Sequence, residues 1–328
     1  MQLSKPTAKA LLKFLGPIFF IFVILRVVDP TATVKVLKAI RPDLALVSIF
    51  LFPVVNAVLV VRWWLISRRL RLGASFKELF QIYYTSWFLS VLPLAGISLV
   101  SKLIYLKEEG KPADAAAVSI TLDKVLDIIG HLFFGIFGFV YFPQSIFKDL
   151  HLVSFFGGML IFAATVLIFR NAIWKLLKSF LKRYTSKNLH GIGHTLELRL
   201  AEFWINFNLK FLALILGISI AIGLLRSLVL YLLAISLGIQ VSFGFIIACR
   251  ALIGIVNMIP VTINGLGTRD AILLLTLPLA GISKEAAIAL GFMAFLWTIG
   301  SKFLGVVFWL KRPLPYSTIR AIKDKLGS

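Results

Sequence analysis

The sequence predicts an all-α, polytopic membrane protein, because the chain is too apolar for a soluble domain and its apolar residues form long blocks. Hydrophobic residues make up 59% of the 328 residues and the mean hydropathy is +0.96, whereas soluble domains are about half apolar. Several blocks reach or approach the ~20 residues that a helix needs to cross a hydrocarbon core. Only helices and closed barrels satisfy the backbone there, and the period-two alternation of barrel strands is absent.

The apolar blocks divide the chain into about six spanning helices and two broken stretches. The spans are expected at residues 11–28, 44–61, 112–140, 151–169, 209–237 and 285–310. The broken stretches, 76–107 and 243–281, contain a proline and glycines near their middles, among them Pro93, Gly96 and Pro260. Proline and glycine end a helix, and each half, of roughly 12–17 residues, is short for a crossing. We therefore expect two re-entrant helical hairpins.

Basic residues set the expected orientation, because cytoplasmic loops carry an excess of Lys and Arg. One arrangement places every rich cluster inside, including the cluster from Arg62 to Lys77 and the one from Lys102 to Lys111. It predicts a multi-pass protein of the cell (cytoplasmic) membrane with both termini in the cytoplasm. The stretch 29–43 is the exception and is expected to be a short amphipathic helix on the outer interface. These loops and anionic lipids account for the net charge of +21, so we expect no nucleic-acid partner.

The two hairpins are expected to form an inverted repeat. The dipeptide Ser75-Phe76 precedes Pro93 with the same spacing by which Ser242-Phe243 precedes Pro260, and the offset between the copies is 167 residues. Three predicted spans lie between the hairpins, so the first would enter from the cytoplasm and the second from outside. Many transporters use this plan. We expect one membrane domain over 1–328, with repeat halves at about 44–169 and 209–310 and no soluble catalytic domain.

Charged residues within the apolar helices are the first candidates for function, because such residues are costly and usually face a protein interior or a wet cavity. A spacing of four places Asp123, Asp127 and His131 on one stripe, and Lys124 can meet Asp127 at a spacing of three. The stripe either lines a substrate path, binding a cationic headgroup, a cation or coupling protons, or forms a structural cluster that Lys124 and nearby arginines neutralise. Both interpretations stay open.

Two arginines, Arg226 and Arg250, lie inside apolar segments and too far from their ends to snorkel easily. A buried arginine pairs with a carboxylate or a phosphate in fork geometry. We interpret both as phosphate-binding cations. The alternative is an ion pair with Asp123, Asp127 or Asp270.

The most specific local signal is the segment 260–270, with the sequence PVTINGLGTRD. Its proline ends one half-helix and its glycines permit a tight turn. Thr268 can cap the next half-helix, with Asp270 in the first turn, and the N–H groups of that N-terminus would be available to an anion. In the alternative, Asp270 itself occupies the anion position. The residues predicted to bind a headgroup here are Asn264, Gly265, Gly267, Thr268, Arg269 and Asp270.

No catalytic residue, cofactor or metal site is predicted. His190 and His194 lie four residues apart, but the glycines between them argue against the helix that would join them at a metal. Aromatic residues near the span ends, including Tyr83 and Trp87, are interpreted as interfacial anchors. The sequence has no nucleotide-binding motif, so energy for any transport would come from gradients or downhill flow.

At four places the chain resembles the lysylphosphatidylglycerol synthase transmembrane (flippase-like) family, which includes uncharacterised UPF0104-type integral membrane proteins. The places are RWWL at 62–65, LP at 92–93 with Gly96, SITLDK at 119–124, and the segment 260–270, which is the most specific. Two departures concern the headgroup contacts. Ile97-Ser98 follow Gly96 where the family often has Gly-Asp, and Lys124 replaces the usual arginine.

The resemblance implies a domain that flips aminoacylated or otherwise modified lipids, or that serves lipid-linked glycan and hopanoid pathways. In two-part members a soluble aminoacyltransferase domain follows; because this chain stops at Ser328, we do not expect lipid aminoacylation. The expected partners are anionic or aminoacylated phospholipids or prenyl phosphates, with a cytoplasmic lipid-modifying enzyme and a homodimer as further candidates. Two other functions stay open: a membrane-embedded lipid-phosphate enzyme using Asp123 and Asp127, and a non-catalytic partner subunit of a lipid or glycan synthase.

Overall fold

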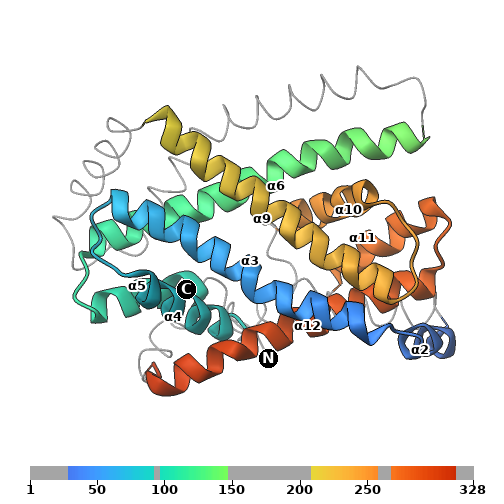
Figure 1. Cartoon of the computed structure of the whole chain (residues 1–328), viewed down its shortest axis with the longest axis horizontal. Coiled ribbons are helices and arrows are strands. Elements are labelled where there is room, and N and C mark those ends of the chain that lie inside the picture. Colours follow the sequence, from blue (N-terminus) through green and yellow to red (C-terminus); the bar gives the residue numbers. More distant parts are fainter. Residues whose placement is uncertain (1–28, 92–96, 147–207, 258–266, 315–328) are drawn as a thin grey trace, which may run out of the picture.

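The computed structural model describes residues 29–91, 97–146, 208–257 and 267–314, and all the regular secondary structure in these ranges is helical (Figure 1). This confirms the predicted all-α class. Three described helices are long and apolar enough to cross a membrane: α3 (Pro42–Arg69), α9 (Leu209–Ser236) and α12 (Lys284–Lys311). The helix α6 (Ala113–Ile146) is longer still, at 34 residues. The predicted spans at 11–28 and 151–169 lie outside the described residues.

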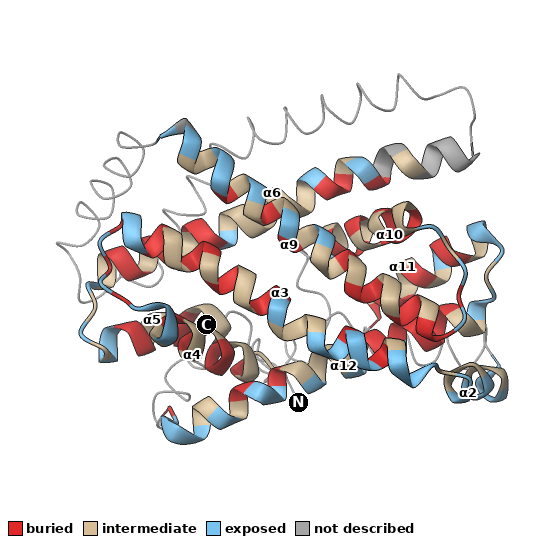
Figure 2. Cartoon of the chain, in the orientation of Figure 1, coloured by how far each residue is buried: buried red, intermediate tan, exposed pale blue. Residues whose placement is uncertain are grey.

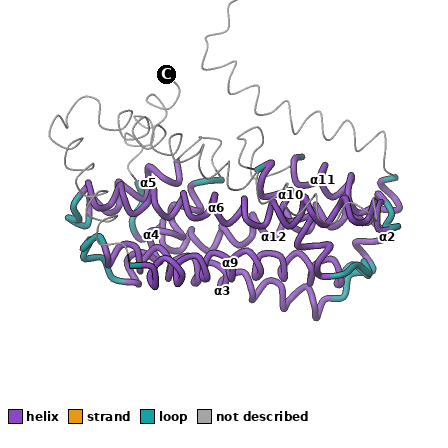
Figure 3. The backbone as a smooth tube through the Cα atoms, turned by 90° about the horizontal axis from the view of Figure 1, so that it is seen from above, coloured by secondary structure: helices purple, strands orange, loops and turns teal. Residues whose placement is uncertain are grey.

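Four shorter helices form two packed pairs at opposite ends of the molecule (Figures 1 and 3). The first pair is α4 (Phe76–Leu89) with α5 (Ile97–Glu108). The second is α10 (Phe243–Val256) with α11 (Thr268–Thr276), which the 3₁₀ turn η1 (Leu277–Ala280) continues. The structure thus pairs the half-helices that the hairpin prediction requires, whereas their re-entry into the membrane stays a prediction.

The residues predicted to break the two hairpins lie between these helices. The predicted breakers Pro93, Gly96 and Pro260 lie in segments 92–96 and 258–266, which are outside the described part of the chain. The predicted headgroup residues Asn264 and Gly265 lie in the second of these segments. The helix ends on both sides of each segment agree with the predicted positions of the breaks.

The long helices α3 and α9 pack against each other and run antiparallel. At one end the Arg41 N–H donates to the carbonyl of Ser236 at 2.7 Å. At the other end the Arg69 guanidinium lies 4.7 Å from the centroid of the Phe211 ring. Seen from above, the two helices lie along one side of the molecule (Figure 3).

The helix boundaries repeat along the chain. Both α3 and α9 have 28 residues and both α4 and α10 have 14, and the second copy starts 167 residues after the first in each case (209 against 42, 243 against 76). After the breaks the offset becomes 171 (268 against 97, 284 against 113), because the second break is four residues longer. The predicted 167-residue offset is therefore an offset of whole helices.

Serine starts the first helix of each pair in the same way. The Ser75 hydroxyl accepts from the N–H of Glu78 at 3.2 Å, and the Glu78 carboxylate accepts from the N–H of Ser75 at 2.5 Å, which completes a capping box. The Ser242 hydroxyl accepts from the N–H of Phe245 at 3.2 Å. The serines found by the sequence offset thus have a local structural reason, since they satisfy N–H groups at the helix start.

The packing of the helices repeats as well. The helix α4 packs against α12, and its counterpart α10 packs against α6; α5 packs against α6, and α11 packs against α12. Exchanging each helix for its counterpart leaves these contacts unchanged, as an approximate two-fold relation between the halves requires.

Burial follows these helix crossings, as the red segments of Figure 2 show. Away from the crossings, large apolar side chains face outward: Phe50 of α3 is 71% exposed and Leu310 of α12 is 65% exposed. Such exposed apolar faces on three span-length helices suit a lipid environment. The short helix α2 (Pro30–Lys38), capped by Asp29, packs against α12. It confirms the short helix predicted within 29–43.

Candidate functional site

A cavity of about 330 Å³ lies where the two halves meet, lined by side chains of α3, α4, α6, α9, α10, α11 and α12 and by Asn257 after α10. The acidic, basic and imidazole side chains in its described lining are Lys124, Asp127, His131, Arg226, Arg250 and Arg269. Five of these six were singled out as headgroup-binding candidates from the sequence, and His131 as a member of their stripe. The packing therefore brings candidates from four separate helices to one place.

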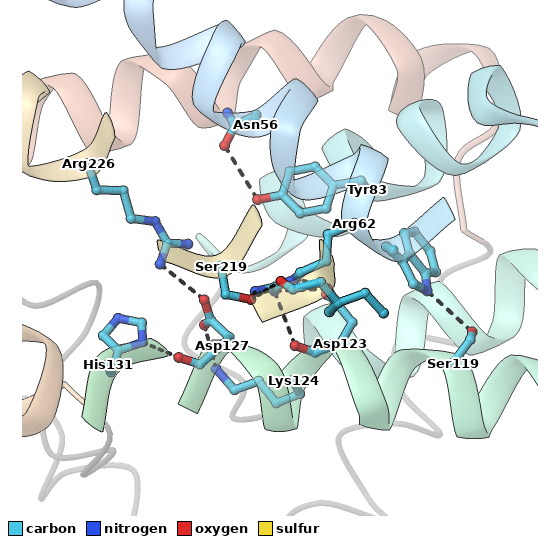
Figure 4. A network of polar contacts seen from close by, with 12 residues as sticks. Asn56, Arg62, Tyr83, Ser119, Asp123, Lys124, Asp127, His131, Ser219 and Arg226 are labelled. Atoms are coloured by element: carbon cyan, nitrogen blue, oxygen red, sulfur yellow. Dashed lines mark hydrogen bonds and ion pairs between the residues drawn. The ribbon is translucent and has the colours of Figure 1, made fainter. Parts of the chain in front are cut away.

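Asp127 of α6 is the carboxylate of this cavity. Its Oδ1 accepts from Nη1 of Arg226 on α9 at 3.0 Å, and Nζ of Lys124 lies 3.4 Å from its Oδ2 (Figure 4). The ring Nδ1 of His131 lies 2.6 Å from the backbone carbonyl oxygen of Asp127. The single negative charge of Asp127 is thus shared between Arg226 and Lys124, so it cannot fully neutralise both. The predicted contact between Lys124 and Asp127 is present, and Arg226 forms the ion pair that was the alternative to phosphate binding.

Asp123, one turn earlier on α6, has a different environment. Its Oδ1 accepts from Nε of Arg62 at 2.9 Å, and its backbone carbonyl accepts from Nη2 of the same arginine at 3.2 Å (Figure 4). The remaining guanidinium nitrogen of Arg62, Nη1, donates to the Ser219 hydroxyl at 3.1 Å. Asp123 does not line the cavity. The predicted stripe is therefore divided: Asp123 belongs to a neutral buried pair, whereas Asp127 faces the cavity.

The environment of Arg62 corrects the assignment of this residue to a cytoplasmic basic cluster. Its side chain is 1% exposed, because α3 continues past it to Arg69 and packs against α6 and α9. The same correction applies to Lys102 of α5, which is 7% exposed. Its ammonium lies 4.6 Å from the ring centroid of Trp63 and 4.9 Å from that of Tyr83, so aromatic faces stabilise its charge.

Arg250 of α10 lines the cavity and is partly buried. Within the part of the chain that the structure describes, it makes no ion pair and no hydrogen bond. Ion pairing with Asp123, Asp127 or Asp270, the alternative for this residue, is therefore not observed. A guanidinium with five donors and no acceptor is costly away from bulk water.

The start of α11 differs in detail from the prediction. Gly267, not Thr268, occupies the N-cap position, with a φ of 95° that favours glycine. The Asp270 carboxylate accepts from the N–H of Gly267 at 2.8 Å. Thr268 is the first helical residue, and its hydroxyl donates to Oδ1 of Asn257 at 2.9 Å. Asp270 thus fills the anion position at this N-terminus, as the alternative interpretation proposed.

Arg269 lies beside this turn and is 7% exposed. Its Nη2 lies 3.4 Å from Oδ1 of Asp270, a long contact. Its Nε is buried and has no hydrogen-bond partner among the described residues. Arg269 also lines the cavity, so a buried donor without a described acceptor lies next to the cavity.

The opposite wall is aromatic and was not recognised from the sequence as part of a site. The Tyr83 hydroxyl donates to Oδ1 of Asn56 at 3.4 Å (Figure 4), and the rings of Phe52 and Trp87 stack with centroids 6.4 Å apart. All four residues line the cavity, so Tyr83 and Trp87 are not interfacial anchors. An asparagine within an apolar span was an available signal.

The repeat offsets supply the second signal. An offset of 167 pairs Tyr83 with Arg250 and Trp87 with Gly254, and all four line the cavity. The later offset of 171 likewise pairs Asp127 with Thr298, which also line it. The cavity therefore lies at the interface between the halves.

Comparison with known proteins agrees with these features. The family described as the lysylphosphatidylglycerol synthase TM region matches residues 10–301. A UPF0104 membrane protein of Methanocaldococcus jannaschii is 25% identical over 307 residues, which cover 88% of this chain and 89% of that protein. Because the family match covers most of the chain, the protein belongs to the lysylphosphatidylglycerol synthase TM region family, and the resemblance inferred from the sequence is confirmed. It is a multi-pass membrane protein with a lipid-related family context.

Proposed function

We propose that this member of the family moves a lipid with a phosphate-bearing headgroup between the two leaflets of the cell membrane. The observation that carries the proposal is the charge of the cavity, whose lining has four Lys and Arg side chains and one carboxylate among the described residues. Charged groups among membrane helices are costly and commonly mark a substrate path. Guanidinium groups match the geometry of phosphate oxygens, so a phosphate would satisfy what the cavity leaves unpaired.

The proposed topology has six spans and two re-entrant hairpins related as an inverted repeat, with both termini in the cytoplasm. The equal helix lengths, the antiparallel course of α3 and α9, and the exchange of packing partners support this topology. Transporters of this plan hold their substrates near the membrane midplane, at the interface between the repeats. The position of the cavity at that interface supports a transport role.

Each basic residue has a proposed task. Arg250 and Arg269 bind the phosphate, because one has no partner among the described residues and the other has an unused Nε. Arg226 divides its donors between the phosphate and Asp127. Lys124, whose side chain is 53% exposed, meets the headgroup first at the rim.

Transport is proposed in preference to catalysis on a lipid phosphate because of how the carboxylates are paired. An enzyme of that kind would use Asp123 and Asp127 together at a divalent ion. Arg62 holds the first and Arg226 holds the second, in separate contacts of 2.9 and 3.0 Å. The two carboxylates thus serve two different arginines, an arrangement that does not favour a shared ion.

The test is a translocation assay in liposomes that contain the purified protein and a trace of fluorescent lipid. Anionic, zwitterionic and prenyl-phosphate lipids are compared, and the dye in the outer leaflet is quenched to follow movement. We expect faster translocation of at least one phosphate lipid than in empty liposomes. Arg250→Gln should abolish most of the gain, whereas Arg68→Gln, which removes an exposed charge, should not. Equal rates with and without protein for every lipid would refute transport.

A further inference from the structure

We infer that the cavity selects lipids whose headgroup ends in a phosphate monoester, and that it discriminates against phosphodiester lipids and aminoacylated lipids. The inference rests on the proposed function for the lipid nature of the ligand. It deepens that proposal by naming the headgroup chemistry. Two lipid classes carry this group: phosphatidic acid and the prenyl phosphates.

The site carries more positive than negative charge. Among the described residues, four Lys and Arg side chains line the cavity and two carboxylates contact them; these residues are Lys124, Arg226, Arg250 and Arg269, with Asp127 and Asp270. Four positive and two negative charges leave a surplus of two, with His131 neutral. The pair of Arg62 and Asp123 adds no net charge.

The surplus positive charge is concentrated in groups with unused hydrogen-bond donors. Arg250 has no hydrogen-bonding or ion-pair partner in the described part of the chain, and the Nε of Arg269 has none either. A guanidinium that is buried or partly buried needs an acceptor, and the strongest acceptors are ionised oxygens. A phosphate monoester has three non-bridging oxygens and a charge of about −1.5 to −2 at pH 7. It would neutralise the surplus and give both arginines an acceptor.

The other lipid phosphates fit this balance less well. A phosphodiester lipid carries one negative charge and two non-bridging oxygens, so one positive charge of the cavity would stay uncompensated. Lysyl-phosphatidylglycerol adds two ammonium groups and would raise the positive charge further. A cationic headgroup would need a free carboxylate, but Asp127 is paired with Arg226 and Asp270 accepts from the N–H of Gly267.

The experiment measures binding to the full chain in detergent, by native mass spectrometry, with ligands that differ in one bond. Dioleoyl phosphatidic acid is compared with dioleoyl phosphatidylmethanol, which has the same chains and a methyl ester on the phosphate. A prenyl phosphate and its methyl ester form the second pair, and lysyl-phosphatidylglycerol is the cationic arm. We expect each monoester to bind about tenfold more tightly than its methyl ester, and the lysyl lipid to bind least. The tighter of the two monoesters identifies the lipid class.

Variants connect the selectivity to the residues. Arg250→Gln should reduce the preference for the monoester about tenfold, Arg250→Lys should retain part of it, and the surface variant Arg68→Gln should leave it intact. Equal binding of ester and monoester by the unmodified chain, or tightest binding of the lysyl lipid, would overturn the inference without any variant.

Failure of the proposed function would look different from failure of this inference. A chain that binds monoesters selectively but moves no lipid in liposomes would refute transport and keep the headgroup assignment. A chain that moves lipids but binds the methyl ester and the monoester equally would refute the headgroup assignment and keep transport.

Discussion

The two halves of this protein share a backbone plan but differ in the chemistry that they bring to the cavity. At equivalent positions the first half has Tyr83 and the second has Arg250; the first has Asp127 and the second has Thr298. The first half therefore supplies an aromatic wall and the carboxylate, and the second supplies three arginines. The repeat determines where side chains meet, whereas the individual substitutions determine which ligand they suit.

Two cations of the first half and two of the second also differ in how fully they are paired. In the first half, Arg62 has a carboxylate, a carbonyl and a hydroxyl as acceptors, and Lys102 lies over two aromatic rings. In the second half, Arg250 has no partner among the described residues and Arg269 has an unused Nε. Breaking a satisfied buried pair is strongly destabilising, whereas a cation without a partner is kept at a cost in stability and suits ligand binding. The contrast suggests experiments that separate stability from activity.

The largest effect is expected where the first half has its satisfied pair. Arg62→Gln leaves Asp123 without its cation in a buried site and should destabilise the fold by about 3–5 kcal/mol. Thermal unfolding in detergent measures this. Arg41→Gln, in a pair whose side chains are 63% and 60% exposed, should cost less than about 1 kcal/mol. Similar losses for the two variants would contradict the assignment of Arg62 to the core.

The next effect concerns the close contact between α12 and α4. A Cβ at Gly305 would overlap the backbone oxygen of Tyr84, so Gly305→Ala must push the helices apart. We expect a loss of about 1–3 kcal/mol in thermal unfolding. Gly300 on the same helix has nothing within 4 Å, and Gly300→Ala should be neutral or stabilising by up to about 1 kcal/mol. A loss at Gly300 equal to that at Gly305 would disprove the steric explanation.

The third prediction compares the equivalent residues of the two cavity walls. Arg250→Gln should lower lipid translocation about tenfold and raise the melting temperature, because it removes an uncompensated charge. Tyr83→Phe loses only a long 3.4 Å hydrogen bond and should change translocation less than about twofold. Liposome assays and melting curves of the two variants test this together. An equal loss of transport would mean that the walls contribute alike.

The smallest effect is expected at the helix starts. Ser75→Ala and Ser242→Ala each remove an N-cap acceptor, which costs about 0.5–2 kcal/mol. The loss should be larger at Ser75, since Glu78 completes a capping box there. Hydrogen exchange of the N–H groups at the start of α4 and of α10 would measure the difference. Faster exchange at α10 than at α4 in the two variants would reverse the comparison.

Much of the fold followed from local patterns. Apolar block lengths predicted α3, α6, α9 and α12 within a few residues at most ends, and the serine–phenylalanine pairs marked the starts of α4 and α10. Proline and glycine placed the breaks. The cap at α11 was predicted less well, because a threonine and a glycine in succession both suit an N-cap, and only the backbone angle at Gly267 distinguishes them.

The sequence predicted many of the residues of the site, but not which of them contact one another. The sequence alone determined that charged residues lie within apolar helices at positions 123, 127, 226 and 250, and that the chain repeats with an offset of 167. It did not determine that Arg62 is buried beside Asp123, that Asp127 pairs with Arg226, or that Arg250 has no partner among the described residues. Periodicity and helix breakers act over a few neighbouring residues. The two ion pairs join residues that are separated in the sequence by 61 and by 99 positions. Only the packing of the helices therefore decides which charges are satisfied and which face a ligand.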